Sequence, residues 1–302
     1  SRRRHTRYPL VTGVQTCALP IFYGSELTAR AGLAYDLLYL LRGIPVVYYG
    51  DEVGMMGDGG DKAARQDMFK TPIWEWQTEP RLGVSPIGSK SALQLTSGTW
   101  ITKLKALAAL RTNHPALATG AQIPRYDDDQ VFAVSRIDAA KRTEYLVAFN
   151  NSAKSMSVRF QTSSPLTSFK GVYNGTSTVK SDKTGWVKLS VPARKGIALQ
   201  ALSPLPTTAA TKVTVSMQYD TNVKVYYAKA DLDTLDPSTV TFVWRPAGTN
   251  AWKVLGVDDA APYRIILDPD KFDSGTRVDV AAIAKSSAGA VTVSGVQSVF
   301  IP

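Results

Sequence analysis

The chain has 302 residues, enough for two or three domains, and its 35 basic and 25 acidic residues give a formal net charge of +10. Four arginines lie within the first seven residues and the other basic residues are spread along the chain, so the sequence lacks the clustered charge of a nucleic-acid-binding face. A single cysteine excludes an intramolecular disulfide, and no apolar run approaches the roughly 20 residues that span a bilayer.

Residues 1–21 follow no structural template, because they have neither helical nor strand periodicity. They resemble the conceptual translation of sequencing-adapter DNA, and the alternative interpretation is a disordered basic arm. We therefore predict a non-native or disordered leader outside the fold, which removes His5 and Cys17 from the candidate functional residues. We also expect the native N-terminal part of the protein to be missing. No apolar segment of a secretory signal follows the charged start.

The first predicted element is a helix that begins at Ser25, a suitable N-cap residue. Apolar residues recur at spacings of four and three, as on a helix that packs against a sheet. This stripe contains Leu27, Ala31, Ala34, Leu38 and Leu41, and it is widened by Leu33, Leu37 and Leu40.

A buried strand is predicted directly after this helix. Gly43 can adopt the positive φ that ends a helix, and Pro45 prevents helical continuation. Val46–Tyr49 form a short β-branched and aromatic run, typical of a parallel strand buried on both faces, and Asp51 and Glu52 follow at its C-terminal end. A helix, a glycine, a proline and a buried strand in this order indicate half of a βαβ unit. In a (β/α)8 barrel, the long loop after such a strand helps to bind the substrate.

The segment Gly43–Glu52 is GIPVVYYGDE, which resembles the eighth-strand signature of the α-amylase family of glycoside hydrolases. The loop after it, GMMGDGGDKAARQDMF, resembles the eighth βα loop of that family, and the helix before it resembles the seventh barrel helix. The resemblance covers roughly residues 22–202. It implies that residues 22–117 are the C-terminal remnant of a (β/α)8 barrel.

The resemblance implies substrate-binding roles for Asp61 and Arg65. Family members of the neopullulanase and oligosaccharide-hydrolase type use such an Asp–Arg pair, followed by a Met as at Met68, to bind sugar hydroxyls on the non-reducing side of the cleaved bond. A carboxylate accepts hydrogen bonds from hydroxyls and a guanidinium donates several. The alternative is a solvated surface ion pair of little energy. Trp74 and Trp76 are interpreted first as core residues and second as platforms for sugar rings.

No catalytic residue is assigned within this chain. Asp51 and Glu52 are adjacent, so on a strand they would point to opposite faces and could not flank one glycosidic bond; we interpret Glu52 as an acid that orients its neighbours. In the resembled family the catalytic carboxylates follow strands four, five and seven, before the helix that begins near Ser25. The seventh-strand motif includes a His, and none occurs in residues 22–113. We therefore expect the chain to be inactive alone.

No metal or cofactor is assigned, although calcium at residues 58–61 is an alternative.

A second helix is predicted from Trp100 to Thr112, with its apolar residues on one side and Lys103 and Lys105 on the other. It resembles the eighth barrel helix of the family. His114, which precedes Pro115, is interpreted as a capping or packing residue.

Two β domains are predicted next, so the fold class is multidomain, α/β followed by all-β. Residues 118–202 contain short alternating strands that indicate an antiparallel β-sandwich, placed like the amylase C-terminal β domain and expected to cover the barrel helices. Residues 203–210 form a linker rich in Pro, Thr and Ala. Residues 211–302 suit an immunoglobulin-like or fibronectin-like sandwich of seven strands. The strands predicted in the first sandwich cover residues 131–137, 144–151, 156–160, 185–191 and 195–202, and those in the second begin at residues 211, 223, 239 and 277.

Trp252 and Tyr263, near strand ends of the last sandwich, are candidate sugar platforms, with ordinary core and rim positions as the favoured interpretation.

The resemblance favours the C-terminal part of a retaining α-glucan glycoside hydrolase that acts on starch-type or maltodextrin-type substrates. The expected partner is an α-glucan oligosaccharide or polysaccharide, with no nucleic acid and no membrane. The family and the appended β module imply a bacterial, extracellular or periplasmic enzyme. The alternatives are a non-catalytic carbohydrate-binding or adhesive protein of two β-sandwiches, and a glucan transglycosylase or branching enzyme of the same family.

Overall fold

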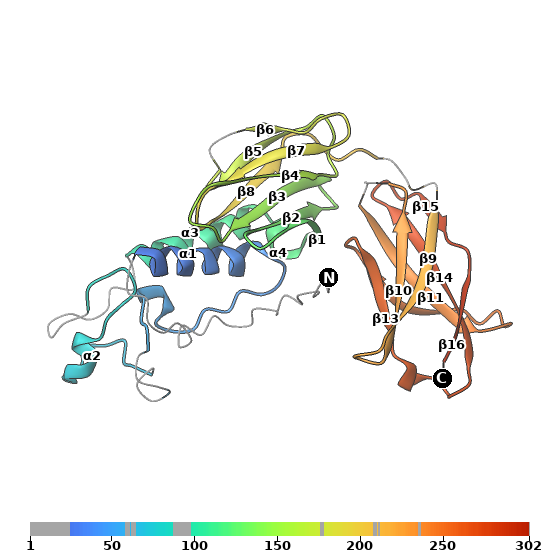
Figure 1. Ribbon diagram of the computed structural model, residues 1–302, viewed down its shortest axis with the longest axis horizontal. Coiled ribbons are helices and arrows are strands. Elements are labelled where there is room, and N and C mark those ends of the chain that lie inside the picture. The colour runs from blue at the N-terminus through green and yellow to red at the C-terminus, as the bar shows by residue number, and fades with distance from the viewer. Residues whose placement is uncertain are drawn as a thin grey trace.

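The computed structural model describes residues 25–57, 61, 65–86, 98–175, 178–207, 210, 212–234 and 237–301. Within these residues, helices come first and two β-sandwiches follow (Figure 1). The helices are α1 (Ser25–Leu40), η2 (Asp51–Val53), α2 (Trp74–Thr78), α3 (Thr99–Asn113), α4 (Ala116–Thr119) and η3 (Pro269–Lys271). The strands of the first sandwich are β1 (Ala121–Asp127), β2 (Val131–Asp138), β3 (Thr143–Asn150), β4 (Met156–Gln161), β5 (Ser168–Tyr173), β6 (Val179–Lys180), β7 (Trp186–Val191) and β8 (Lys195–Ala201). Those of the second are β9 (Val213–Asp220), β10 (Val225–Leu232), β11 (Ser238–Pro246), β12 (Lys253–Asp258), β13 (Tyr263–Leu267), β14 (Arg277–Ser286), β15 (Val291–Val293) and β16 (Gln297–Phe300).

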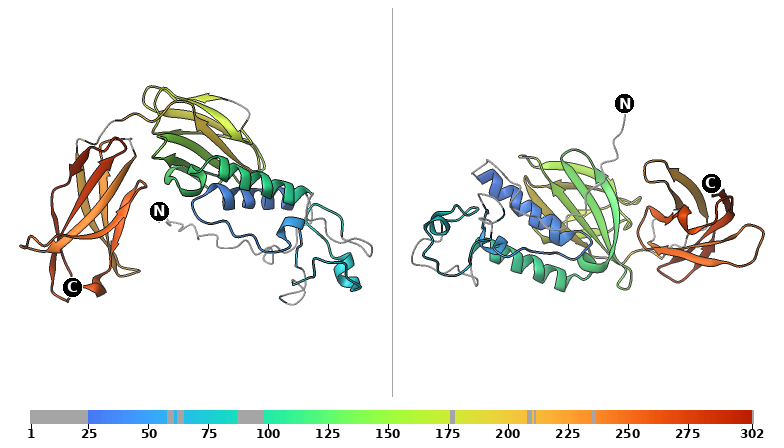
Figure 2. Two further views of the ribbon diagram at one scale, coloured as in Figure 1. Left: turned by 180° about the vertical axis from the view of Figure 1, so that it is seen from behind. Right: turned by 90° about the horizontal axis from the view of Figure 1, so that it is seen from below.

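The helices α1 and α3 lie side by side beneath the first sandwich (Figures 1 and 2). One side of α1 packs on α3, where Leu27 and Tyr35 share a buried cluster with Trp100 and Leu107. Another side packs on the sheet, where the α1 residues Leu33 and Leu40 share a cluster with residues of β2, β3 and β8, Val134, Val147, Phe149 and Ala198 among them. A helix buried on two sides needs the wide apolar stripe predicted for it. The prediction that the first sandwich covers these helices is confirmed.

A buried carboxylate connects the helices to the sandwich. Asp36 on α1 is 1% exposed, and its carboxylate accepts hydrogen bonds from Lys103 Nζ, from Tyr173 Oη (2.6 Å) and from the Gly196 amide (2.8 Å). Burial and the charge of Asp36 raise the pKa of Tyr173, which keeps its hydroxyl a donor. A buried charge is tolerated only when it is paired and hydrogen-bonded, so Asp36 fixes the relative positions of α1, α3, β5 and β8.

The position of Lys103 corrects the prediction for α3. The sequence predicts Lys103 beside Lys105, on the side of the helix away from its apolar residues. Lys105 is exposed, but the side chain of Lys103 is 22% exposed and turns toward α1. The physical reason is the carboxylate of Asp36, whose negative charge is neutralised by the ammonium group of Lys103.

The first sandwich consists of a six-stranded sheet, in the order β1-β2-β3-β8-β5-β6, and a two-stranded sheet, β4-β7. All its pairings are antiparallel, and thirteen buried residues form its core, including Phe160, Phe169 and Leu199. The five predicted strands are confirmed. Sequence patterns missed β1, which has a register shift between Pro124 and Tyr126, and the short strands β5 and β6. Proline and bulges obscure the alternation that identifies a strand.

The second sandwich has one sheet in the order β13-β10-β9 and another in the order β12-β11-β14-β15, with β16 also paired to β14. The pairs are antiparallel, and the two sheets enclose a core around Phe242, Val240 and Val280. The predicted all-β architecture is confirmed, with eight strands in the described residues where seven were expected. The division at residues 118, 203 and 211 stays a prediction.

The predicted barrel strand at Val46–Tyr49 is wrong. The backbone of residues 44–48 is assigned to no strand, and the side chains of Ile44, Val46 and Tyr48 are 89%, 59% and 51% exposed. A strand exists only through hydrogen bonds to a neighbouring strand, and in the described part of the chain no segment pairs with this one. The positive φ expected at Gly43 is confirmed, at +131°, and Gly50 has φ +95° as well.

His114 is the C-cap residue of α3, which confirms the predicted capping or packing role. Its backbone amide donates to the Leu110 carbonyl (2.9 Å), and Nδ1 lies 3.2 Å from Tyr145 Oη. The two rings meet edge to face at 5.5 Å. Burial, followed by the charge of Lys141, lowers the pKa of His114, so the folded state favours its neutral form.

We expect Asp36→Asn to lower the free energy of unfolding by about 3 kcal/mol, because it leaves Lys103 without its buried counter-charge. Urea denaturation measures this change. Glu26→Gln is the comparison, since Glu26 is an exposed carboxylate on the same helix that pairs with Arg30 and Arg194, and it should have a much smaller effect. Equal midpoints for Asp36→Asn and the wild type would contradict the role assigned to Asp36.

We expect the stability of the protein to rise with pH as His114 loses its proton. Because the folded pKa lies below the unfolded value near 6.5, the unfolded state binds more protons between the two values, and the contribution is complete above about pH 6.5. It is lost as the pH falls toward the folded pKa. Thermal unfolding at pH 5.5 and 7.5 tests this: His114→Gln should reduce the difference between the two melting temperatures, and an unchanged difference would exclude His114 as its source.

Candidate functional site

The candidate site lies in the loop after α1, which begins with a tight turn. The Asp51 amide donates to the Tyr48 carbonyl (3.2 Å), and the Gly50 amide donates to Glu52 Oε2 (2.9 Å). A Cβ at Gly50 would lie 2.6 Å from Met55 Sδ, so both the positive φ and the space require glycine. Glu52 thus holds the turn that presents Tyr48 and Tyr49, whose rings lie 4.8 Å apart at 47°.

Asp61 and Arg65 form an ion pair on the surface of this loop. Arg65 Nη2 donates to both carboxylate oxygens of Asp61, at 2.7 Å and 3.0 Å. This hydrogen bond and the negative charge of Asp61 raise the pKa of Arg65. The side chains are 63% and 79% exposed for Arg65 and Asp61, so the predicted residues do come together and both face solvent. Their predicted role in binding sugar stays a prediction.

Exposed aromatic side chains occur along the same part of the chain. Trp74, the first residue of α2, is 70% exposed, and Phe69 is 75% exposed. The interpretation of Trp74 as a core residue is therefore wrong, because the short helix α2 leaves its indole uncovered; Trp76 is partly buried. An exposed indole has a free apolar face of the kind on which a sugar ring stacks.

The described residues of this loop include groups that can bind a sugar. A carboxylate, a guanidinium and exposed aromatic rings can recognise hydroxyl groups and the apolar face of a sugar. Asp51 is 5% exposed and stands in η2, so it does not form an acid–nucleophile pair with Glu52 across an open site. Among the described residues, no group of three His, Cys, Asp or Glu side chains is arranged to hold a metal ion, and residues 58–60 of the calcium alternative lie outside them.

The two aromatic candidates of the last sandwich behave differently. Tyr263 is 5% exposed and its hydroxyl accepts a hydrogen bond from the Ser238 amide (3.0 Å), so it is a core residue and not a sugar platform. Trp252 is 38% exposed, but the guanidinium of Arg245 lies over its ring at 4.4 Å. At least one face of Trp252 is therefore already covered by a cation–π contact.

Sequence reasoning missed three polar residues that organise the helices around this loop: Asp36, Arg111 and Arg136. Asp36 could have been found, since it is a charged residue inside the apolar stripe formed by Leu33, Leu37 and Leu40. Arg111 and Arg136 gave no such signal, because their partners are backbone carbonyls brought together by the fold.

Comparison with known proteins finds sequence similarity to proteins named as α-amylases and related enzymes. Residues 126–201 match the family described as alpha amylase, C-terminal all-beta domain. The chain is 38% identical over 271 residues to the "Alpha-amylase" of Streptomyces lividans, covering 88% of this chain and 29% of that protein. It is 32% identical over 128 residues to the "Cyclomaltodextrinase" of Thermoanaerobacter pseudethanolicus, covering 42% of this chain and 18% of that protein.

A solved α-amylase of Geobacillus thermoleovorans, complexed with acarbose, is 18% identical and covers 58% of this chain and 34% of that one, with a TM-score of 0.43. Similarity at this level establishes no shared overall fold for the whole chain. The sequence matches, by contrast, confirm the relationship predicted from the motifs. No helix among the described residues is long and apolar enough to cross a membrane.

Proposed function

We propose that this chain, a relative of the α-amylase-family glycoside hydrolases that carries their C-terminal all-beta domain, is part of an enzyme that cleaves α-glucans with retention of configuration. The observation that carries the proposal is the 38% identity to an α-amylase over 88% of the chain. The chain spans 29% of that relative, so the activity of the whole enzyme is part of the proposal.

The proposed contribution of this chain is sugar binding by Asp61 and Arg65. Only Nη2 of Arg65 is engaged by Asp61 among the described residues, which leaves Nε and Nη1 to donate to sugar hydroxyls. The carboxylate oxygens of Asp61 can each accept a second hydrogen bond. Charge-assisted hydrogen bonds of this kind are stronger than neutral ones, and their geometry fixes the orientation of the sugar.

The first sandwich is proposed to support the catalytic part of the enzyme. It buries Leu33 and Leu40 of α1 and Leu110 of α3, which would otherwise face water. In a retaining glycosidase one carboxylate forms the glycosyl-enzyme and another serves as acid and base. Neither role is assigned to a residue of this chain, so the carboxylates are proposed to come from other parts of the enzyme.

We expect the purified chain to release no reducing sugar from soluble starch or maltoheptaose, because it supplies no pair of carboxylates suited to a glycosidase. A reducing-sugar assay over hours with protein at micromolar concentration would detect slow turnover. Turnover that follows the protein through successive purification steps would refute this prediction.

We expect Arg65→Ala to weaken the binding of maltoheptaose to the chain by about tenfold, the effect of losing one hydrogen bond from a charged group. Isothermal titration calorimetry measures the change. Arg30→Ala is the matched control, since Arg30 is also an exposed arginine paired at i,i+4, with Glu26 at 2.8 Å. Equal weakening by both substitutions, or no binding by the wild type, would contradict the role proposed for Arg65.

A further inference from the structure

Several arginine side chains gather at the C-terminal end of α1. The last carbonyls of a helix lack intrahelical partners and carry partial negative charge, and α1 has no basic residue in its own last turn. Arg111 from α3 takes this role: Nη1 donates to the carbonyls of Tyr39, Leu41 and Leu117, and Nη2 donates to that of Gly43. Together with Arg42 and Arg136 it forms a cluster of three guanidinium groups, here called the arginine cluster.

Arg136 makes the positive charge of this cluster energetically costly, because its guanidinium is buried. It is 0% exposed, donates to the carbonyls of Leu40 (3.2 Å) and Gly120 (2.9 Å), and its Nε has no hydrogen-bond partner. Burial and the like charges of Arg111 and Arg42 lower its pKa to about 9, and the nearby carboxylate of Asp259 opposes this effect. A buried cation without an ion-pair partner is costly, so a carboxylate close to the cluster is favourable.

Asp259 belongs to the other sandwich. It stands in the turn between β12 and β13, and its Oδ1 lies 3.2 Å from Arg42 Nη1. Next to this ion pair, Ala260 and Ala261 of the same turn pack against a buried apolar cluster of the first sandwich, formed by Ala121, Ile123, Ile137 and Leu205. The β12–β13 turn therefore contacts both the charged side chain of Arg42 and the apolar cluster of the first sandwich.

The predicted linker contributes to the same contact. Leu205 is 1% exposed, and its amide donates to the Arg142 carbonyl at 2.7 Å, so the chain is already attached to the first sandwich there. At the other end, Thr292 Oγ1 donates to the Ala210 carbonyl at 2.7 Å. Both ends of the predicted linker are therefore attached by hydrogen bonds to a sandwich.

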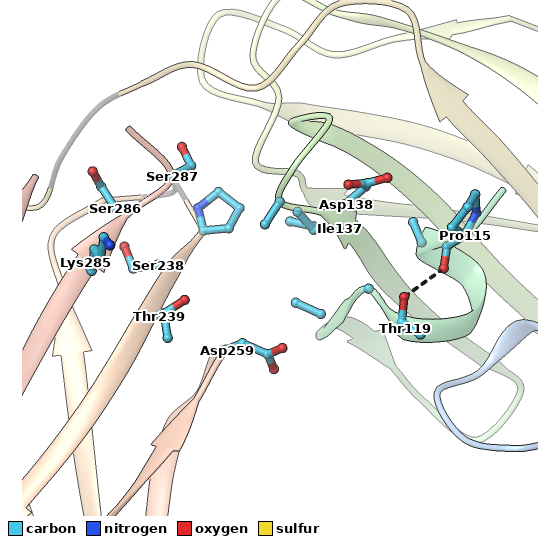
Figure 3. A pocket seen from close by; sticks show the side chains of 15 residues that line it. Pro115, Thr119, Ile137, Asp138, Ser238, Thr239, Asp259, Lys285, Ser286 and Ser287 are labelled. Atoms are coloured by element: carbon cyan, nitrogen blue, oxygen red, sulfur yellow. Dashed lines mark hydrogen bonds between the residues drawn. The ribbon is translucent and has the colours of Figure 1, made fainter. Parts of the chain in front are cut away.

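A cavity of about 260 Å³ lies beside the turn, between the sandwiches (Figure 3). Asp138 and Thr119 line it from one side, and Thr239, Lys285 and Asp259 line it from the other. The two sandwiches are separated by open space at this part of the contact, so close packing at the cavity does not hold them together. The stabilising contributions lie at the rim, in the ion pair and the small apolar cluster.

We infer that the β12–β13 turn, with Asp259 at its centre, is a docking surface whose partner is the arginine cluster at the end of α1. The last sandwich is then held in one orientation and is not a module that swings freely on a linker. Because Arg42 and Gly43 lead directly into the candidate site loop, docking also restrains the start of that loop. This inference is independent of the proposed function.

The test uses the full chain and measures whether the two sandwiches tumble together. Nitrogen-15 relaxation at low salt should give residues 121–201 and 213–301 one shared rotational correlation time. Asp259→Arg should separate the two values, and the exchanged pair Arg42→Asp with Asp259→Arg should restore the shared value. Asp270→Arg, the same charge change at an exposed position of η3, is the control and should leave the wild-type result unchanged.

Salt gives a second measurement. Asp259 and Arg42 are about half exposed, with side chains 46% and 52% accessible, so raising the ionic strength should screen the pair and loosen docking. Circular dichroism establishes that each variant remains folded. Independent tumbling of the wild-type sandwiches would overturn the inference. So would shared tumbling in Asp259→Arg, or an exchanged pair that fails to recouple the sandwiches.

Discussion

The attachment of α1 and α3 to the first sandwich depends on one buried carboxylate. Asp36 stands on α1 and receives hydrogen bonds from α3, β5 and β8, so four elements are tied at one point. Its surroundings also explain a glycine: a Cβ at position 196 would lie 2.7 Å from Asp36 Cβ. Apolar packing between helices and sheet tolerates small sliding movements, whereas a charge in a low-dielectric interior requires its partners at fixed positions.

The C-terminal end of the same helix is capped by basic residues that lie far from it in the sequence. The carbonyls at the C-terminal end of α1 need donors, and two arginines from α3 and β2 provide them. Long side chains with several N–H groups suit this purpose, since one guanidinium can satisfy several carbonyls at once. This arrangement places positive charge where the last sandwich approaches the helices. The carboxylate of Asp259 in that sandwich forms an ion pair with Arg42 there.

The surface left open by this framework is the loop after α1. Its exposed apolar and aromatic side chains are Ile44, Val46, Tyr48, Tyr49, Phe69 and Trp74. Asp61 and Arg65 form an ion pair nearby in the chain. Exposed apolar surface of this extent marks a region that functions in contact with something else. In the proposed enzyme that contact is with the rest of the catalytic part and with an α-glucan.

The sequence by itself determined the types of the regular elements, because hydrophobic periodicity specifies α1, α3 and the regular strands of both sandwiches. The motif at residues 43–68 also indicated the resemblance to α-amylase-family proteins. It also paired Asp61 with Arg65, although only by resemblance. Tertiary structure alone decided the roles of Arg111 and Arg136, since their partners are backbone carbonyls that the fold brings together. It also decided that Val46–Tyr49 remain outside any strand, because a strand is completed by a neighbour and no local pattern supplies one.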